Sequence, residues 1–382
     1  MNQHRKIVLI GPAHPLRGGL ATFNERLVRE YRNNGEDAYI YSFSLQYPGL
    51  LFPGKTQFSA EPAPDDIPIF INVNSINPIN WIRTGFELRK QKPDFVIVKY
   101  WMPFMAPCFG TICRIIKGNK HTRIITIIDN LVPHEKRIGD RLLSGYWIGT
   151  VDGCIAMSQS VMDDLEKFDT EKPKLFCPHP LYDNFGDPIT KEEAKSQLNL
   201  DPSFHYVLFF GFIRDYKGLD LLLEAFADNR MQQMKIKLLI AGEFYCDPKP
   251  YREIISRHNL EDQVIISNDF IPDSKVRNYF CAADLVVQPY KSATQSGVTQ
   301  IAYHFNKAMI ITDVGGLAEI VPHEKVGYVV NPDPAEISAA IVRFYSENRE
   351  TEFSVNASVE KQKYSWKSMV ETIDRLLDQI KK

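Results

Sequence analysis

Short runs of branched apolar residues alternate with helical patterns along nearly the whole of this 382-residue chain. Each run is apolar at consecutive positions, which predicts strands that are buried on both faces. Helical periodicity fills most of the gaps, and Leu20, Phe23, Leu27 and Tyr31 show it after the first run. Strands that alternate with helices form parallel sheets covered by helices on both faces. The predicted fold class is therefore α/β, with doubly wound Rossmann-like sheets.

Two series of strands indicate two domains, which also suits a chain of 382 residues. A polar segment with Pro and Gly, 178–203, separates the series and predicts domains over 1–182 and 183–364. A final helix is expected over 365–380, after a Ser cap. The predicted strands are 6–11, 37–43, 67–73, 94–100, 123–129, 152–157 and 174–177, then 206–211, 235–241, 263–267, 284–289, 308–313 and 327–331.

Composition and charge exclude several classes of protein. A net charge of −2 gives no electrostatic reason to expect a nucleic-acid partner. The N-terminal apolar run is too short for a signal peptide, and Pro and Gly interrupt the most apolar region, 100–116, so no membrane span is expected. Six cysteines without a C-x-x-C pair indicate reduced core thiols. We expect a cytoplasmic protein, and its oligomeric state is left open.

The stretch 207–226 is the strongest candidate for a binding site. A buried strand ends at Gly211, a short loop carries Arg214 and Lys217, and an amphipathic helix follows from Gly218. The amides and dipole of a helix N-terminus attract anions, and the two cations would neutralise one directly. The pattern predicts a site for a diphosphate; a solvated loop with two surface cations is the alternative.

Two loops of the first half also follow predicted strands. The segment 11–19 contains Arg17, Gly18 and Gly19, whose small size lets backbone approach a ligand at the sheet edge. The segment 128–135 carries Asp129 and His134, and a histidine there could orient a hydroxyl or act as a general base. A simple turn and a helix-capping histidine remain the alternatives.

A further loop follows the strand predicted over 284–289. It is rich in hydroxyl groups and enters a helix near Gly297, so Ser296, Gly297 and Val298 would offer backbone N–H groups to a second phosphate. Thr294 and Gln295 supply neutral donors and acceptors suited to sugar hydroxyls. Packing of a strand against a helix is the alternative.

Two observations concern charged side chains elsewhere in the chain. Glu243 follows another predicted strand and is expected to face the site, because burying an unpaired carboxylate is costly. Histidines and carboxylates lack the spacing of a metal site, and no G-x-S-x-G motif is present, so we expect no metal ion and no serine nucleophile.

Taken together, these motifs resemble the retaining nucleotide-sugar glycosyltransferases of family 4, which have the two-domain GT-B fold. The resemblance covers essentially the whole chain. It implies an acceptor-side domain over 1–182, a donor domain over 183–364, a cleft between them, and a helix over 365–382 that crosses back to the first domain. The motifs that carry it are Gly18-Gly19, Asn130–Glu135, Gly211–Gly218, Ile240–Glu243, Ala282–Pro289 and Thr312–Glu319.

The resemblance also implies an activity: transfer of a hexosyl or related sugar from a nucleoside diphosphate to a hydroxyl acceptor, without a metal or other cofactor. The acceptor would be a glycan or a lipid-linked molecule in the assembly of a surface polysaccharide or glycolipid. Arg214 and Lys217 would stabilise the leaving diphosphate and His134 would orient the acceptor. Donor contacts are implied for Gly18, Gly19, Gly211, Glu243, Thr294, Gln295, Ser296, Gly297, Val298 and Gln300, and acceptor-side contacts for Arg17 and Asp129.

The chain departs from the family at two places. Members usually carry two glutamates eight positions apart, where this sequence has Ala293 and Ile301. Gln295, Thr299 or Gln300 would have to replace part of their hydrogen bonding. The family's His-Asn dipeptide reads Asp129-Asn130 here. A catalytically inactive relative that binds a nucleotide sugar or a glycan is therefore the alternative, and epimerisation or phosphorolysis is a third, weaker interpretation.

The apolar segment 100–110, YWMPFMAPCFG, is a candidate for an acceptor groove or for contact with lipid. A slight excess of basic residues in the first half is compatible with peripheral association at the inner face of a membrane. A strand end that leads into a buried helix is the alternative.

Overall fold

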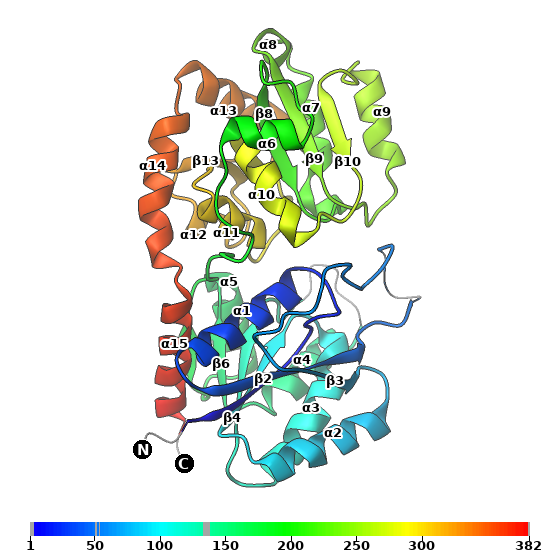
Figure 1. Ribbon diagram of the computed structural model, residues 1–382, viewed down its shortest axis with the longest axis vertical. Coiled ribbons are helices and arrows are strands. Elements are labelled where there is room, and N and C mark those ends of the chain that lie inside the picture. Colours follow the sequence, from blue (N-terminus) through cyan, green and yellow to red (C-terminus); the bar gives the residue numbers. More distant parts are fainter. Residues whose placement is uncertain (1–3, 50–51, 53, 133–137, 381–382) are drawn as a thin grey trace. The chain divides into compact units, whose positions relative to one another are not determined.

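The computed structural model describes residues 4–49, 52, 54–132 and 138–380 (Figure 1). Its internal contacts divide the chain into two units, Met1–Pro180 with Ser365–Lys382, and Leu181–Tyr364. The sequence predicted a boundary after residue 182. Leu181 and Tyr182 instead belong to the second unit, because the Leu181 N–H donates to the Tyr364 carbonyl at 2.9 Å and the Tyr182 ring packs 5.9 Å from that of Phe185.

The first unit contains a parallel sheet of seven strands in the order β3-β2-β1-β4-β5-β6-β7. Consecutive apolar positions along these strands are buried on both faces, as in Phe95–Tyr100, where all six residues are buried. All seven predicted strands are present with shifts of one or two residues at their ends. They are β1 Lys6–Ile10, β2 Asp37–Leu45, β3 Ile69–Asn74, β4 Phe95–Tyr100, β5 Arg123–Ile128, β6 Gly153–Ala156 and β7 Lys174–Phe176.

Helices cover both faces of this sheet. Val8 and Ile10 of β1 point into a core that includes α3 and α4, while α1 lies on the other face beside α15 (Figure 1). The helices are α1 Gly19–Asn33, α2 Pro78–Gln91, α3 Ala106–Lys117, α4 Asp140–Ile148, α5 Gln159–Phe168 and α15 Trp366–Gln379.

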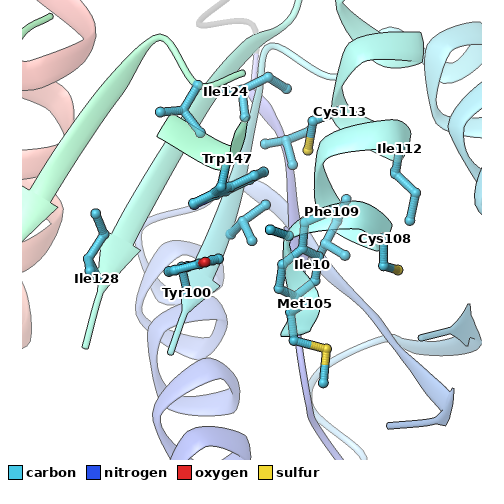
Figure 2. Close-up of a cluster of buried hydrophobic side chains, with 14 of the residues drawn as sticks. Ile10, Tyr100, Met105, Cys108, Phe109, Ile112, Cys113, Ile124, Ile128 and Trp147 are labelled. Atoms are coloured by element: carbon cyan, nitrogen blue, oxygen red, sulfur yellow. The ribbon is translucent and has the colours of Figure 1, made fainter. Parts of the chain in front are cut away.

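The apolar segment 100–110 lies in this core (Figure 2). Tyr100, Met105 and Phe109 are completely buried, and the Tyr100 ring stacks on that of Trp147 with centroids 5.6 Å apart. The idea that this segment forms a lipid-contacting or acceptor-lining surface is therefore wrong for these residues. The alternative, a strand end that leads into a buried helix, is confirmed.

The second unit contains a parallel sheet of six strands in the order β10-β9-β8-β11-β12-β13. Its strands are β8 His205–Phe210, β9 Ile236–Ala241, β10 Val264–Ser267, β11 Leu285–Gln288, β12 Ala308–Thr312 and β13 Gly327–Val330. Its α-helices are α6 Lys191–Gln197, α7 Leu219–Phe226, α8 Asn229–Gln233, α9 Lys249–Arg257, α10 Asp273–Ala282, α11 Gly297–His304, α12 Leu317–Ile320, α13 Pro334–Ser346 and α14 Glu350–Glu360. Two doubly wound sheets confirm the predicted fold class.

The C-terminal helix α15 packs on the first unit although the second unit precedes it in the chain. The Ser365 side chain caps it by accepting the Ser368 N–H. Trp366 packs against Phe23 of α1 with ring centroids 5.0 Å apart, and Asp374 forms an ion pair with Arg5 at 2.6 Å. One helix thus joins residues from the two ends of the chain.

Candidate functional site

The loops that follow β8, β11 and β12 lie against one another at one edge of the second sheet. Parallel strands bring their carboxyl ends to the same edge, where doubly wound folds bind ligands. Two glycines allow the close approach: a Cβ on Gly218 would lie 1.9 Å from the Pro289 carbonyl oxygen, and one on Gly315 would lie 1.6 Å from that of Ala293. Both glycines also have positive φ, 68° and 52°.

The loop after β9 joins this edge in the same way. A Cβ on Gly242 would lie 2.0 Å from the Gly211 carbonyl oxygen. The Ile213 N–H donates to the Glu243 carbonyl at 2.9 Å, so backbone of the two loops is directly paired. The structure therefore brings Gly211 and the buried Glu243 to the same edge as the other loops.

Arg214 and Lys217 lie in this assembly of loops. Lys217 ends a 3-10 turn, Asp215–Lys217, that precedes α7. Its Nζ is 3.1 Å from the position of a Cβ on Gly211, and the Cγ2 of Val298 is 3.6 Å from the same position. Lys217, Gly211 and Val298, which are far apart in the sequence, are thus neighbours.

Aromatic rings border the two cations. The Lys217 Nζ lies 5.5 Å from the centroid of Tyr290, and the Arg214 guanidinium carbon lies 5.3 Å from that of Tyr245. The Tyr245 ring also stacks on Phe212 at 4.3 Å. The sequence analysis did not single out Tyr245, and its place in the loop after β9 was the signal available.

The electrostatics of the two cations favour an anionic ligand. Burial and the positive charge of Arg214 lower the pKa of Lys217 to about 8. Within the described part of the chain, neither Arg214 nor Lys217 forms an ion pair with a carboxylate. Desolvated cations without a counter-ion are costly, and an anion would compensate that cost.

The start of α11 lies beside this pair through Val298. Ser296 precedes the helix, and its hydroxyl is 3.2 Å from the Tyr290 hydroxyl, so it does not cap the helix. Thr294 and Gln295 are half-buried in the loop before it. The start of α11 and Lys217 therefore lie on the same side of Gly211, and the role predicted for the amides of Ser296, Gly297 and Val298 stays a prediction.

Gln300 is placed differently from the other candidates. Its side chain is fully buried, and neither of its polar atoms has a hydrogen-bond partner. Helical geometry puts it on the side of α11 shared by Gly297 and His304, which approach Tyr182 and the Gly186 carbonyl. This side differs from the one on which Val298 approaches Gly211.

The two positions at which the resemblance implies glutamates are both apolar and buried. Ala293 is 8% exposed and Ile301 6% exposed. Thr299, between them, donates its hydroxyl to Gln288 of β11 at 3.3 Å and so serves the packing of helix on strand.

In the first unit the candidate residues also lie at the carboxyl ends of strands. Gly18 has φ of 101° and precedes α1, of which Gly19 is the first residue, and the Arg17 N–H donates to the Gln57 carbonyl. Asp129 follows β5 and is mostly buried. His134 lies outside the described residues.

Asp129 has a partner that the sequence analysis missed. Lys99 of β4 donates to it at 2.9 Å, and the same Nζ lies 3.4 Å from the ring centroid of Phe23. A single lysine within the apolar run FVIVKY was the available signal, because a buried charge requires a partner. Burial lowers the pKa of Lys99 although Asp129 opposes that shift, and burial with the Lys99 charge lowers the pKa of His179 to about 3.

The described residues hold neither a metal-binding group nor a membrane-spanning helix. None of their His, Cys, Asp and Glu side chains form a group of three able to hold a metal ion. None of the helices within the described ranges is both long and apolar enough to cross a membrane.

Sequence comparison finds a similarity in the second unit. Residues 205–347 match the sequence profile of glycosyl transferases group 1. The D-inositol 3-phosphate glycosyltransferase of Segniliparus rotundus is 26% identical over 214 residues, which are 54% of this chain and 46% of that protein. The lipopolysaccharide 1,2-N-acetylglucosaminetransferase of Salmonella typhimurium is also 26% identical over 214 residues, 53% of this chain and 54% of that protein. The chain spans about half the length of these curated relatives.

Comparison of structures extends the likeness to the whole chain. Sucrose-phosphate synthase from Thermosynechococcus elongatus superposes with a TM-score of 0.76 at 17% identity, covering 98% of this chain and 99% of that one. HepE from Anabaena, solved with UDP and glucose, gives 0.75 at 16% identity and covers 98% and 100%. The chain therefore has the GT-B fold. The resemblance to GT-B glycosyltransferases that the motifs indicated is confirmed, with residues 205–347 carrying the family's sequence pattern.

Proposed function

We propose that this protein is a retaining glycosyltransferase that moves a hexosyl or related sugar from a nucleoside diphosphate to a hydroxyl acceptor. The observation that carries the proposal is the pair Arg214 and Lys217, which are half-buried and have no carboxylate partner in the described residues, with the Lys217 Nζ beside Gly211. The group 1 pattern over 205–347 supports it, and HepE was solved with UDP-glucose.

In this proposal the cations and the first amides of α11 hold the diphosphate of the donor. As the bond between the anomeric carbon and the diphosphate oxygen breaks, negative charge develops on the leaving group. Arg214, Lys217 and the helix-end amides offset that charge without a metal ion. A donor phosphate oxygen takes the proton of the acceptor hydroxyl, and the sugar is transferred with retention of configuration. The acceptor is oriented by His134, Arg17 and Asp129, as the resemblance implies.

The process served is the assembly of a cell-surface polysaccharide or glycolipid at the cytoplasmic side of a membrane. Two relatives support this: the lipopolysaccharide N-acetylglucosaminetransferase of Salmonella typhimurium and the lipopolysaccharide core mannosyltransferase LpsB of Rhizobium meliloti. LpsB is 26% identical over 156 residues, 39% of this chain and 43% of that protein.

A panel of radiolabelled sugar nucleotides, each offered with lipid and glycan acceptors, tests the activity. We expect transfer from one nucleotide sugar and loss of that transfer in Arg214→Ala and Lys217→Ala. Arg252→Ala, an exposed cation of α9, is the matched control and should keep full activity. Absence of transfer from every donor, together with nucleotide binding that does not depend on Arg214 or Lys217, would refute the proposal.

A second candidate function follows from one departure from the family. Ala293 and Ile301 replace two carboxylates, and both positions are buried and apolar. A non-catalytic protein that binds a nucleotide sugar or glycan would tolerate this loss. Normal binding of a nucleotide sugar without turnover on any acceptor would favour this candidate over the transferase.

A further inference from the structure

Exposed apolar side chains of the first unit concentrate in one short segment. Among the large hydrophobic residues that are exposed in the described part of the chain, six lie between residues 70 and 86. They are Phe70, Ile71, Ile76, Ile79, Ile82 and Phe86. Scattered exposed hydrophobics are ordinary on a protein surface, whereas such a concentration indicates a surface of contact.

Three of these side chains form a stripe on α2. Ile79, Ile82 and Phe86 are 78%, 46% and 54% exposed, and their spacing of three and four residues places them on one side of the helix. The other side is anchored, because Leu88 is buried and a Cβ on Gly85 would lie 2.9 Å from the Ile115 side chain of α3. The stripe therefore faces away from the core.

Two cations share the exposed side of α2. Arg83 and Lys90 fall between and beside the apolar residues at helical spacing and are both exposed. Within the described residues neither forms an ion pair with a carboxylate. Glu87, the acidic residue of this helix, accepts a hydrogen bond from the Tyr41 hydroxyl. The surface thus combines apolar bulk with positive charge.

We propose that the α2 stripe, Ile79, Ile82 and Phe86 with Arg83 and Lys90, docks the protein on an anionic lipid bilayer. An amphipathic helix of this composition lies in the plane of the interface, with its apolar side chains at the boundary of headgroups and acyl chains and its cations near lipid phosphates. The docking does not depend on the proposed transfer. If both hold, it brings the enzyme to lipid-linked acceptors.

Charge makes a bilayer a better occupant than a second copy of the chain. In a two-fold symmetric dimer the same patch contributes from both subunits. Arg83 and Lys90 would then face a patch that carries the same two cations, and Glu87 is the one carboxylate that α2 offers against them. An anionic lipid surface supplies the missing negative charge.

Sedimentation with vesicles tests the docking, in the absence of any nucleotide sugar. We expect the protein to bind vesicles of equal parts phosphatidylcholine and phosphatidylglycerol, more weakly at high salt, and not to bind phosphatidylcholine alone. The double variant Ile79→Asn/Phe86→Asn should weaken binding about tenfold or more. Its control, Val355→Asn/Val359→Asn, removes an equally exposed apolar pair from α14, 59% and 62% exposed, and should bind normally.

A second pair of variants separates charge from apolar contact. Arg83→Gln/Lys90→Gln should weaken binding to anionic vesicles about tenfold, whereas Arg252→Gln/Lys275→Gln, two exposed cations of the second unit, should not. Thermal unfolding verifies that each variant is folded.

Three results would overturn the proposal: no binding to anionic vesicles, binding that survives both α2 variants, or equal losses in the controls. A concentration-dependent dimer that Ile79→Asn/Phe86→Asn abolishes, without vesicle binding, would assign the stripe to a second copy of the chain. Because the assay contains no donor, its failure leaves the transferase proposal standing, and absence of transfer leaves the docking proposal standing.

Discussion

Two lysines show how neighbouring residues decide the role of one side-chain type. Desolvation lowers the pKa of both Lys99 and Lys217. Lys99 is compensated by the Asp129 carboxylate at 2.9 Å, whereas Lys217 faces the second cation, Arg214. Lys99 therefore contributes to the folded core, and Lys217 is poised to gain its counter-ion from a ligand.

Binding of a nucleoside diphosphate should depend on the protonation of Lys217. In the protein without ligand, the pKa of Lys217 is about 8. A bound diphosphate would raise this pKa, so the protein with a protonated Lys217 binds the diphosphate more tightly. We expect affinity for UDP or another matching diphosphate to fall by up to about tenfold per pH unit as the pH rises above that value. Isothermal titration calorimetry across this range measures the slope. Lys217→Arg, whose charge does not titrate, should lose the slope, and a slope unchanged in Lys217→Arg would contradict the assignment.

Removing one partner of the Lys99–Asp129 pair should destabilise the protein strongly, whereas replacing both partners by apolar residues should destabilise it little. Lys99→Ala or Asp129→Ala leaves one buried charge unpaired, and each should lower the free energy of unfolding by about 3 kcal/mol. Lys99→Met/Asp129→Leu removes both charges and should cost much less than the sum of the single changes. Chemical denaturation of the four proteins gives the coupling energy. Additive effects would show that the two side chains do not act as a pair.

At the scale of elements, glycines allow the loops of the second sheet to meet. Because Gly218 and Gly315 lack a Cβ, the carbonyls of Pro289 and Ala293 can approach them closely. The Gly211 carbonyl approaches Gly242 in the same way. The loops after four strands can then pack as one assembly that holds Lys217 beside Val298. The G-x-x-R-x-x-K-G pattern marked these residues in the sequence, but the contacts between loops depend on how the strands pair.

Gly218→Ala should disrupt this assembly. Both the positive φ and the approach to Pro289 oppose a Cβ, so we expect a loss of about 3 kcal/mol or more in unfolding free energy and weaker diphosphate binding. Gly139 is the matched control, because its φ is also positive, 96°, while a Cβ there would meet nothing within 4 Å. Gly139→Ala should cost only about 1 kcal/mol and leave binding unchanged. Similar losses at both sites would mean that the contact with Pro289 contributes nothing.

At the scale of the whole molecule, the chain returns to its first unit at the end. Residues of α15 are buried on the first unit, among them Trp366 and the fully buried Ile373. Arg5 and Asp374, 369 positions apart, form an ion pair there. Stability of the first unit therefore depends on residues that follow the entire second unit.

Ile373→Ala should destabilise the first unit selectively. Removing a fully buried isoleucine costs about 3 kcal/mol. If the two units unfold in separate calorimetric transitions, we expect the loss in only one of them. Val359→Ala on α14, where the side chain is 62% exposed, should shift neither transition measurably. A loss shared equally by both transitions would contradict the assignment of α15 to the first unit.

Much of the fold could be predicted from the sequence, and less of the site. The thirteen strands were predictable because an apolar run is a local property, and their ends shifted by only one or two residues. The segment 100–110 is apolar whether it is buried or exposed, so its sequence could not decide between core and surface. For the same reason, the sequence did not predict that the apolar residues of α2 are exposed.

The sequence by itself determined the order of strands and helices, the two parallel sheets and the loop that carries Arg214 and Lys217, because each rests on residues close together in the chain. The tertiary structure decided which charges are compensated and which apolar segment is core. Those outcomes depend on contacts between distant residues, such as Lys99 with Asp129 and Arg5 with Asp374. Burial and ion pairing arise only when residues distant in the chain pack together, so a local sequence pattern does not determine them.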